Sequence, residues 1–187
     1  MKKLLLVVLT IGLAVAVQAQ KVTGDISCLK GQSQINIKFD YEGVTYDGDS
    51  ESKYFKKEDL AKKADWRTAW TSTYRTEKWE PRLTEDINKE IAKKKMECGD
   101  FPEATYTIIV KLVDIDPGSF AGPMSVPAKI TANASIVNTE TNEVMATIEL
   151  KKIAYNPYFT APRPELRVAE AFSCVGELIG KKLSKIK

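Results

Sequence analysis

The chain of 187 residues contains no histidine. Histidine is the side chain whose ordinary pKa lies closest to neutral pH, and it is the most common protein ligand of transition metals. Its absence excludes Ser-His-Asp and Cys-His mechanisms. It also excludes zinc sites that use an imidazole ligand. We therefore expect no catalytic residue of these classes and no cofactor.

Cysteine is scarce as well. Cys28, Cys98 and Cys174 are far apart in the sequence and lack the close pairing of a cysteine-only metal site. In an oxidising compartment we expect one disulfide and one remaining thiol. The sequence does not identify the pair, and we take Cys28 with Cys98 as the candidate. Cys174 falls within the apolar pattern of the last predicted helix, where a buried thiol is typical.

Long apolar runs are missing beyond the amino-terminal segment. Residues 4–17 are apolar or nearly so, follow Lys2 and Lys3, and lead to small residues around Ala19. About fourteen apolar residues are too few for a transmembrane helix, which needs roughly 20. Residues 1–19 are therefore predicted to be a signal peptide. We expect a periplasmic or secreted protein with no transmembrane segment after cleavage, and no acyl anchor, because no cysteine follows Ala19 directly.

A surplus of basic charge is also lacking. Removal of Lys2 and Lys3 would leave 26 basic residues against 25 acidic ones. Nucleic-acid binding is therefore not expected. Residues 20–187 have the length of a single domain, which would bury about 70% of its unfolded surface. We expect a monomer or a weak dimer.

Alternating apolar residues predict strands over about 35–41, 106–113, 130–136 and 144–150, with a shorter one at about 25–29. The polar residues 138–143 predict a turn that joins the last two strands into an antiparallel hairpin.

Helical spacing predicts three helices: about 58–75, a second starting near Pro81, and a third from about 167 to the end. Gly99 is the expected left-handed cap of the second helix. Gly176 and Gly180 are expected to let the third helix approach the sheet closely. The fold predicted from these elements is α+β with two layers, in which an antiparallel or mixed sheet of about four or five strands carries helices on one face.

Tryptophan side chains suggest a binding surface. Trp66, Trp70 and Trp79 could stack on a glycan, since flat aromatic rings pack against sugar rings. Large rings at helical spacing more often form the buried face of a helix, so core packing is the alternative.

Carboxylates in the segment after the first long strand suggest a calcium loop. Asp47, Asp49 and Glu51 alternate, and Glu58 occupies the twelfth position. Ser52 stands where the sharp turn of such a loop needs glycine, and the neighbouring lysines oppose cation binding. A plain acidic turn is the alternative interpretation.

Two long connections rich in proline and glycine are candidate loops for a ligand or partner. Their anchors would be side chains of types that are enriched in interfaces: Phe120, Met124, Tyr155, Tyr158, Phe159 and Arg163. Packing of these loops against the core of the domain is the alternative.

The whole pattern resembles a family of small secreted proteins of Gram-negative bacteria without a characterised function. The resemblance rests on the lysine-led leader, the aromatic residues 66–79, the strand that ends in Asp116-Pro117-Gly118, and the closing helix. The layout is also similar to the amino-terminal part of the TolB translocation protein. This resemblance implies an envelope protein that binds or assembles with an unknown envelope protein or small ligand. The alternative is a carboxylate-based hydrolase acting on envelope or glycan substrates.

Overall fold

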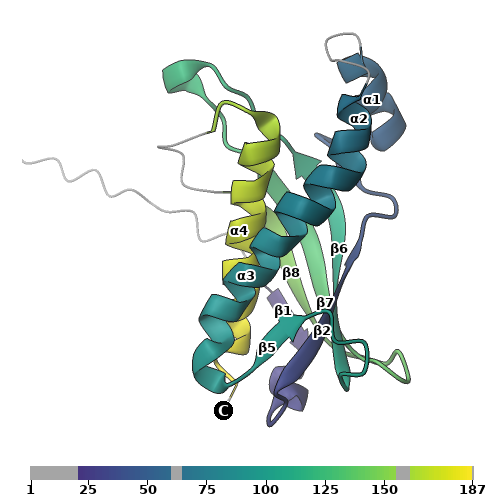
Figure 1. The fold of residues 1–187 in the computed structure, drawn as a ribbon, viewed down its shortest axis with the longest axis vertical. Coiled ribbons are helices and arrows are strands. Elements are labelled where there is room, and N and C mark those ends of the chain that lie inside the picture. Colours follow the sequence, from purple (N-terminus) through teal and green to yellow (C-terminus); the bar gives the residue numbers. More distant parts are fainter. Residues whose placement is uncertain (1–20, 60–64, 155–160, 187) are drawn as a thin grey trace, which may run out of the picture.

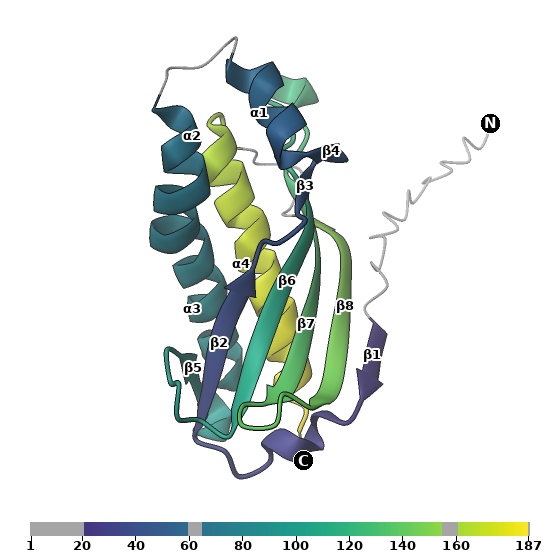
Figure 2. The same ribbon diagram turned by 90° about the vertical axis from the view of Figure 1, so that its right-hand side faces the viewer.

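The computed structural model describes residues 21–59, 65–154 and 161–186. The predicted signal peptide therefore lies outside the described residues. The fold is α+β, with one mixed sheet and helices against one of its faces (Figures 1 and 2). The strands are β1 (Lys21–Gly24), β2 (Gln34–Asp40), β3 (Thr45–Tyr46), β4 (Asp49–Ser50), β5 (Glu97–Gly99), β6 (Tyr106–Asp116), β7 (Lys129–Asn138) and β8 (Val144–Ala154).

The sheet has eight strands, with the order β1-β8-β7-β6-β2-β5 and with β3 and β4 attached beside β6. The pairs β1–β8, β8–β7 and β7–β6 are antiparallel, whereas β2 runs parallel to both β6 and β5. Parallel neighbours require a crossover connection, and the helices between β2 and β5 provide it. The predicted hairpin is confirmed. The predicted count of four or five strands is too low, because β1, β3, β4 and β5 have four residues or fewer and carry little periodic signal.

Four α-helices and several short helical turns complete the described fold. The α-helices are α1 (Glu51–Asp59), α2 (Trp66–Thr68), α3 (Glu80–Ile91) and α4 (Pro164–Leu183). Two π-helical stretches, Ala69–Thr73 and Arg75–Trp79, connect α2 to α3. The 3₁₀ turns are Ile26–Leu29, Ala92–Lys94 and Gly122–Met124.

Three local predictions were wrong. Residues 26–29 form a 3₁₀ turn started by the Asp25 side chain, which accepts a hydrogen bond from the Ser27 N–H at 2.8 Å. The two predicted central helices are one continuous helical segment from Trp66 to Ile91 in which Pro81 lies in the first turn of α3. Lys95, and not Gly99, takes the left-handed conformation after this segment, at φ 57°.

Helices α3 and α4 lie side by side on the sheet (Figure 2). The inner face of β7 presents Ile130, Ala132, Ala134 and Ile136, all fully buried. The predicted apolar stripe of the last helix is buried as well, from Val168 to Leu183. None of the helices in the described ranges has the length and apolarity needed to cross a bilayer.

Gly176 and Gly180 face α3 and not the sheet. A β-carbon at residue 180 would lie 2.9 Å from the backbone oxygen of Ile87. The prediction of a close backbone approach was correct, but its partner was wrong. The two glycines bring α4 against α3, which fixes the position of the helix that carries the aromatic side chains.

Candidate functional site

The aromatic side chains of the segment 66–79 share one face because this segment is π-helical. Thirteen residues separate Trp66 from Trp79, which is about 3.6 turns of an α-helix and would leave the two rings on opposite sides. The π-helix is wound more loosely and bonds each N–H to the carbonyl five residues earlier. Such bonds join Tyr74 to Ala69 and Glu80 to Arg75. Trp70 consequently packs on Trp79, with ring centroids 5.1 Å apart.

Hydroxyl side chains accompany this unusual winding. Thr71, Ser72 and Thr76 each donate to the carbonyl oxygen four residues earlier, at 3.0, 2.7 and 3.1 Å. These are the acceptors that an α-helix would use for its backbone N–H groups. The backbone N–H groups of Tyr74 and Glu80 bond one residue further back. A run rich in serine and threonine thus accompanies the π-helical stretches, although Thr84 makes the same kind of bond within the α-helix α3.

The rings of the segment differ in their burial. Trp79 is fully buried, stacks on Phe172 of α4 at 5.6 Å and donates its indole N–H to the backbone oxygen of Glu165 at 3.0 Å. Trp70 is 2% exposed. Trp66 and Tyr74 are half-buried. The aromatic series therefore starts at a surface and ends in the core.

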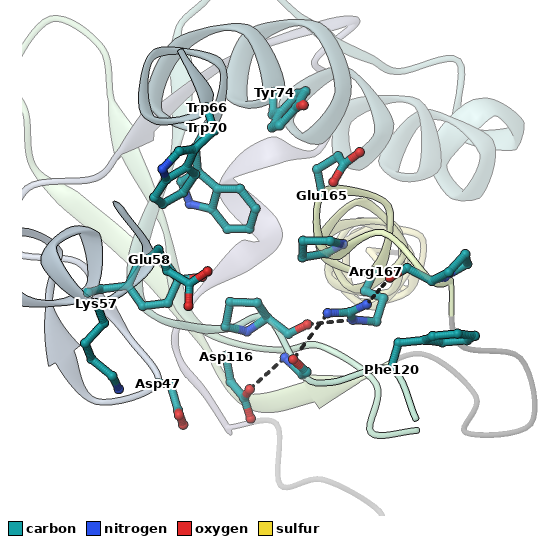
Figure 3. Close-up of a pocket in the computed structure, with 15 residues that line it drawn as sticks. Asp47, Lys57, Glu58, Trp66, Trp70, Tyr74, Asp116, Phe120, Glu165 and Arg167 are labelled. Carbon is teal, nitrogen blue, oxygen red and sulfur yellow. Dashed lines mark hydrogen bonds between the residues drawn. The ribbon is translucent and has the colours of Figure 1, made fainter. Parts of the chain in front are cut away.

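An open cleft with a volume of about 570 Å³ lies at the surface end of this series (Figure 3). Its walls come from α1, from the helical segment at Trp66, from the loop after β6 and from the start of α4. The lining residues are Asp47, Tyr54, Lys57, Glu58, Trp66, Trp70, Tyr74, Asp116, Pro117, Gly118, Phe120, Pro162, Pro164, Glu165 and Arg167.

One wall of the cleft is aromatic. Tyr54 of α1 packs edge-on against Trp66 at 6.4 Å and tilted against Trp70 at 6.3 Å. Trp66 and Trp70 pack against each other at 6.0 Å. Burial raises the pKa of Tyr54, so its hydroxyl stays protonated at physiological pH. The wall therefore offers ring faces, ring edges and a neutral hydroxyl.

Arg167 holds the opposite side of the cleft in place. Its guanidinium donates to the backbone oxygens of Pro117 at 2.8 Å and Gly118 at 3.3 Å (Figure 3). It also donates to Ala161 at 3.0 Å and Pro162 at 2.8 Å. The residue is 5% exposed, and burial lowers the pKa of its side chain. Arg167 thus joins two loops to α4, and its donors are directed to backbone oxygens.

Carboxylates form much of the polar rim. Asp116 accepts the Gly118 N–H at 2.8 Å and lies 3.5 Å from the Lys129 ammonium. Glu165 is nearly buried and pairs with Arg163 at 3.3 Å. In Figure 3 the Glu58 side chain points into the cleft from α1. The rim therefore places hydrogen-bond acceptors beside aromatic faces.

The structure separates the three tryptophans proposed for glycan stacking. Trp66 and Trp70 line the cleft, and Trp66 has the more accessible ring. Trp79 does not reach the surface, because it fills the contact between the helical segment and α4. For Trp79 the alternative of core packing applies.

The predicted loop anchors also differ in their position relative to the cleft. Phe120 lines the cleft and is 53% exposed, whereas Met124 is 78% exposed at the tip of its loop. Arg163 is exposed next to Glu165. Tyr155, Tyr158 and Phe159 lie outside the described residues.

The carboxylates of the predicted calcium loop do not converge. Asp49 pairs with Lys53 at 2.5 Å and Lys57 at 3.2 Å, and Glu51 pairs with Arg75 at 2.7 Å. Glu51 opens α1 and Glu58 lies near its end, so the segment is strand and helix and not a loop. Asp47 is exposed. Within the described ranges no group of acidic, histidine or cysteine side chains is placed to hold a metal ion.

The predicted disulfide is not formed, because all three cysteines are free. Cys28 lies in the 3₁₀ turn that contacts β8, whereas Cys98 lies in β5 at the other edge of the sheet. Burial raises the pKa of Cys98 to about 12 and that of Cys174 to about 11.

Tyr54, Glu165 and Arg167 have no signal in the sequence that would place them at a cleft, and only the fold brings them together. Pro117 and Pro164 belong to the two proline-rich connections that were expected to bind a ligand or partner. Nothing in the Asp116-Pro117-Gly118 turn indicates an arginine 50 positions later.

Comparison with known proteins gives distant likenesses. No protein-family model matches the sequence, and no curated protein matches it. Among solved structures, a PelC dodecamer from Paraburkholderia phytofirmans superposes with a TM-score of 0.48 and 7% identity, over 87% of this chain and 97% of that chain. A point variant of the same dodecamer, in a second crystal form, gives a TM-score of 0.39 and 8% identity, over 85% and 94%. We infer neither a ligand nor an assembly from likenesses at this level.

Proposed function

We propose that the chain is an exported, non-catalytic binding protein of the cell envelope, and that its cleft holds a sugar unit of a glycan. The observation that carries this proposal is the open cleft of about 570 Å³ with an aromatic wall and a carboxylate rim. The leader predicted from the sequence supports export.

A sugar suits this combination of surfaces. A pyranose ring has apolar C–H faces, which pack on aromatic rings such as the half-buried Trp66 and Tyr54. Its edges carry hydroxyl donors, and ionised carboxylates are pure acceptors. Asp116 and Glu58 supply such acceptors at the rim. The two kinds of contact are available within one cleft.

Binding is favoured over hydrolysis by the placement of the carboxyl groups. A glycosidase needs a general acid with a raised pKa within hydrogen-bond reach of the substrate. Burial raises the pKa of two described glutamates, Glu80 and Glu170. Neither belongs to the cleft lining. The cleft therefore offers aromatic rings and carboxylate oxygens for binding, while the two glutamates with a raised pKa lie outside it.

A glycan array probed with the chain beginning at Gln20 tests the proposal. The buried core is built from residues 29–186, so this form keeps the core intact. We expect binding to a restricted set of oligosaccharides and no release of reducing ends on prolonged incubation. Release of reducing ends would support the hydrolase instead, and an array without any bound glycan would contradict the proposed ligand.

A further inference from the structure

The connection between β6 and β7 contains an uncharged loop. Residues 117–128, which we call the apolar loop, include no Asp, Glu, Lys or Arg in a chain where 28% of residues are charged. A charged pair, Asp116 and Lys129, marks its base. The loop extends beyond the end of the sheet, at the end of the molecule opposite the carboxyl terminus (Figures 1 and 2).

Exposed apolar side chains gather on this loop. Met124 is 78% exposed, Phe120 53% and Val126 40%. Val22, Val113 and Val144 are the other large exposed hydrophobics of the described residues, and they lie on three different strands. Single exposed apolar side chains are ordinary, but a cluster of them marks an interaction surface.

Several backbone N–H groups of the apolar loop have hydrogen-bond partners within the loop. Ser119 and Val126 exchange two backbone bonds of 3.0 and 2.9 Å. Ser125 accepts the Ala121 N–H at 3.0 Å and donates to the Gly122 oxygen at 2.7 Å. The Met124 and Ser125 N–H groups bond back within the turn.

Three backbone donors that would otherwise need partners are missing from the loop, since Pro117, Pro123 and Pro127 have no N–H. The paired N–H groups of the loop, and the proline residues without an N–H, leave water at a lower cost than unpaired N–H groups would.

The base of the apolar loop is held firmly. Arg167 donates to the backbone oxygens of Pro117 and Gly118. Gly118 has φ 63°, and a β-carbon there would lie 2.2 Å from the Val126 oxygen, so the two arms of the loop are in direct contact. The tip is therefore presented as a fixed protrusion.

We propose that the tip of the apolar loop inserts into the interfacial region of a lipid bilayer. The loop is convex, uncharged and self-bonded, and a fluid lipid surface can close around any such protrusion. A protein pocket would need a matching shape, and interface hot spots usually add polar contacts, which this tip does not offer beyond Ser119 and Ser125. Because the loop has no charge, the binding is weak, reversible and insensitive to salt and to headgroup charge.

Cosedimentation with vesicles tests this inference, using the chain beginning at Gln20 so that the leader does not contribute. Vesicles of phosphatidylcholine, alone or mixed with phosphatidylglycerol, should bind the protein equally well. Met124→Ser should lower the partition coefficient about tenfold, and Phe120→Ser/Met124→Ser more, because each substitution removes apolar surface that the bilayer would bury. Met124 is the diagnostic position, because it does not line the cleft.

Val144→Ser is the matched control, since Val144 is 58% exposed on β8, outside the loop. It should leave the partition coefficient unchanged, and all variants should keep the melting temperature of the unchanged chain. The inference is overturned if the protein does not sediment with either vesicle, if Met124→Ser and Val144→Ser act alike, or if only the anionic vesicles bind.

Discussion

Gly176 of α4 stands directly against the backbone of Leu83 in α3: a β-carbon at position 176 would lie 2.2 Å from the Leu83 carbonyl oxygen. Replacement of glycine by alanine within a helix normally stabilises a protein by about 0.5–1 kcal/mol. Here we expect Gly176→Ala to destabilise it by about 1–3 kcal/mol, because the helices must separate. Urea unfolding measures the change.

Gly180→Ala provides the comparison for that experiment. A β-carbon there would lie 2.7 Å from the Glu90 β-carbon and 2.9 Å from the Ile87 carbonyl oxygen, which is less close than the 2.2 Å contact at position 176. A smaller loss is therefore expected at position 180. If Gly176→Ala stabilised the protein, the described packing of α3 against α4 would be wrong.

The elements that were predicted correctly from the sequence are those in which apolar residues recur at a regular, short spacing. The alternation in residues 130–136 and 144–150 located β7 and β8, and the stripe from Val168 located α4. The pattern of Gly176 and Gly180 correctly indicated a close approach. It did not indicate which element is approached, because the opposing surface belongs to a distant segment.

The cleft could be predicted only in part, for the same reason. Trp66, Trp70 and Trp79 were all candidates for glycan stacking, but the sequence does not show that Trp79 packs against the distant Phe172 and is buried. The π-helical winding, and the hydroxyl groups that bond to the backbone along it, are not visible in hydrophobic periodicity. The contact of Arg167 with Pro117 joins residues 50 positions apart, without a local signal.

Replacement of Arg167 by lysine should loosen both loops at the cleft. Lysine keeps the charge but cannot direct donors to several carbonyl oxygens at once. We expect Arg167→Lys to lower the free energy of unfolding by about 1–3 kcal/mol, since buried acceptors lose their partners. Chemical denaturation tests this, with Arg163→Lys as the control, because the Arg163 side chain is 62% exposed and lysine keeps its charge, so little change is expected. Equal effects of the two changes would refute the structural role of Arg167.

Glu80 should make stability depend on pH in a defined direction. Burial raises the pKa of this carboxyl, against the opposing effect of Arg75. Its folded pKa thus lies above its unfolded value of about 4.3, so the folded state is destabilised as pH rises through that range. Glu80→Gln should therefore raise the melting temperature at pH 7, and the gain should disappear towards pH 4. The exposed Glu77→Gln serves as control, and a gain at pH 4 equal to that at pH 7 would contradict this explanation.

The three thiols should react in an order set by their burial. Cys28 and Cys174 are half-buried, and Cys98 is 1% exposed with a pKa of about 12. Without denaturant, iodoacetamide should leave Cys98 unmodified, and unfolding should expose all three thiols to the reagent. Mass spectrometry of peptides obtained without reduction checks both statements. Detection of a peptide in which Cys28 and Cys98 are cross-linked would show that the disulfide expected from the sequence forms. It would contradict the free thiols of the structure.

The most direct test of the proposed function is a calorimetric titration of the best glycan on the array against Trp66 variants. Trp66 is the half-buried indole of the cleft wall, so its replacement leaves the core series from Trp70 to Trp79 in place. We predict that Trp66→Ala raises Kd about tenfold, as expected for the loss of one aromatic contact, and that Trp66→Tyr restores most of the affinity. An unchanged Kd for Trp66→Ala would contradict the assignment of this cleft as the binding site.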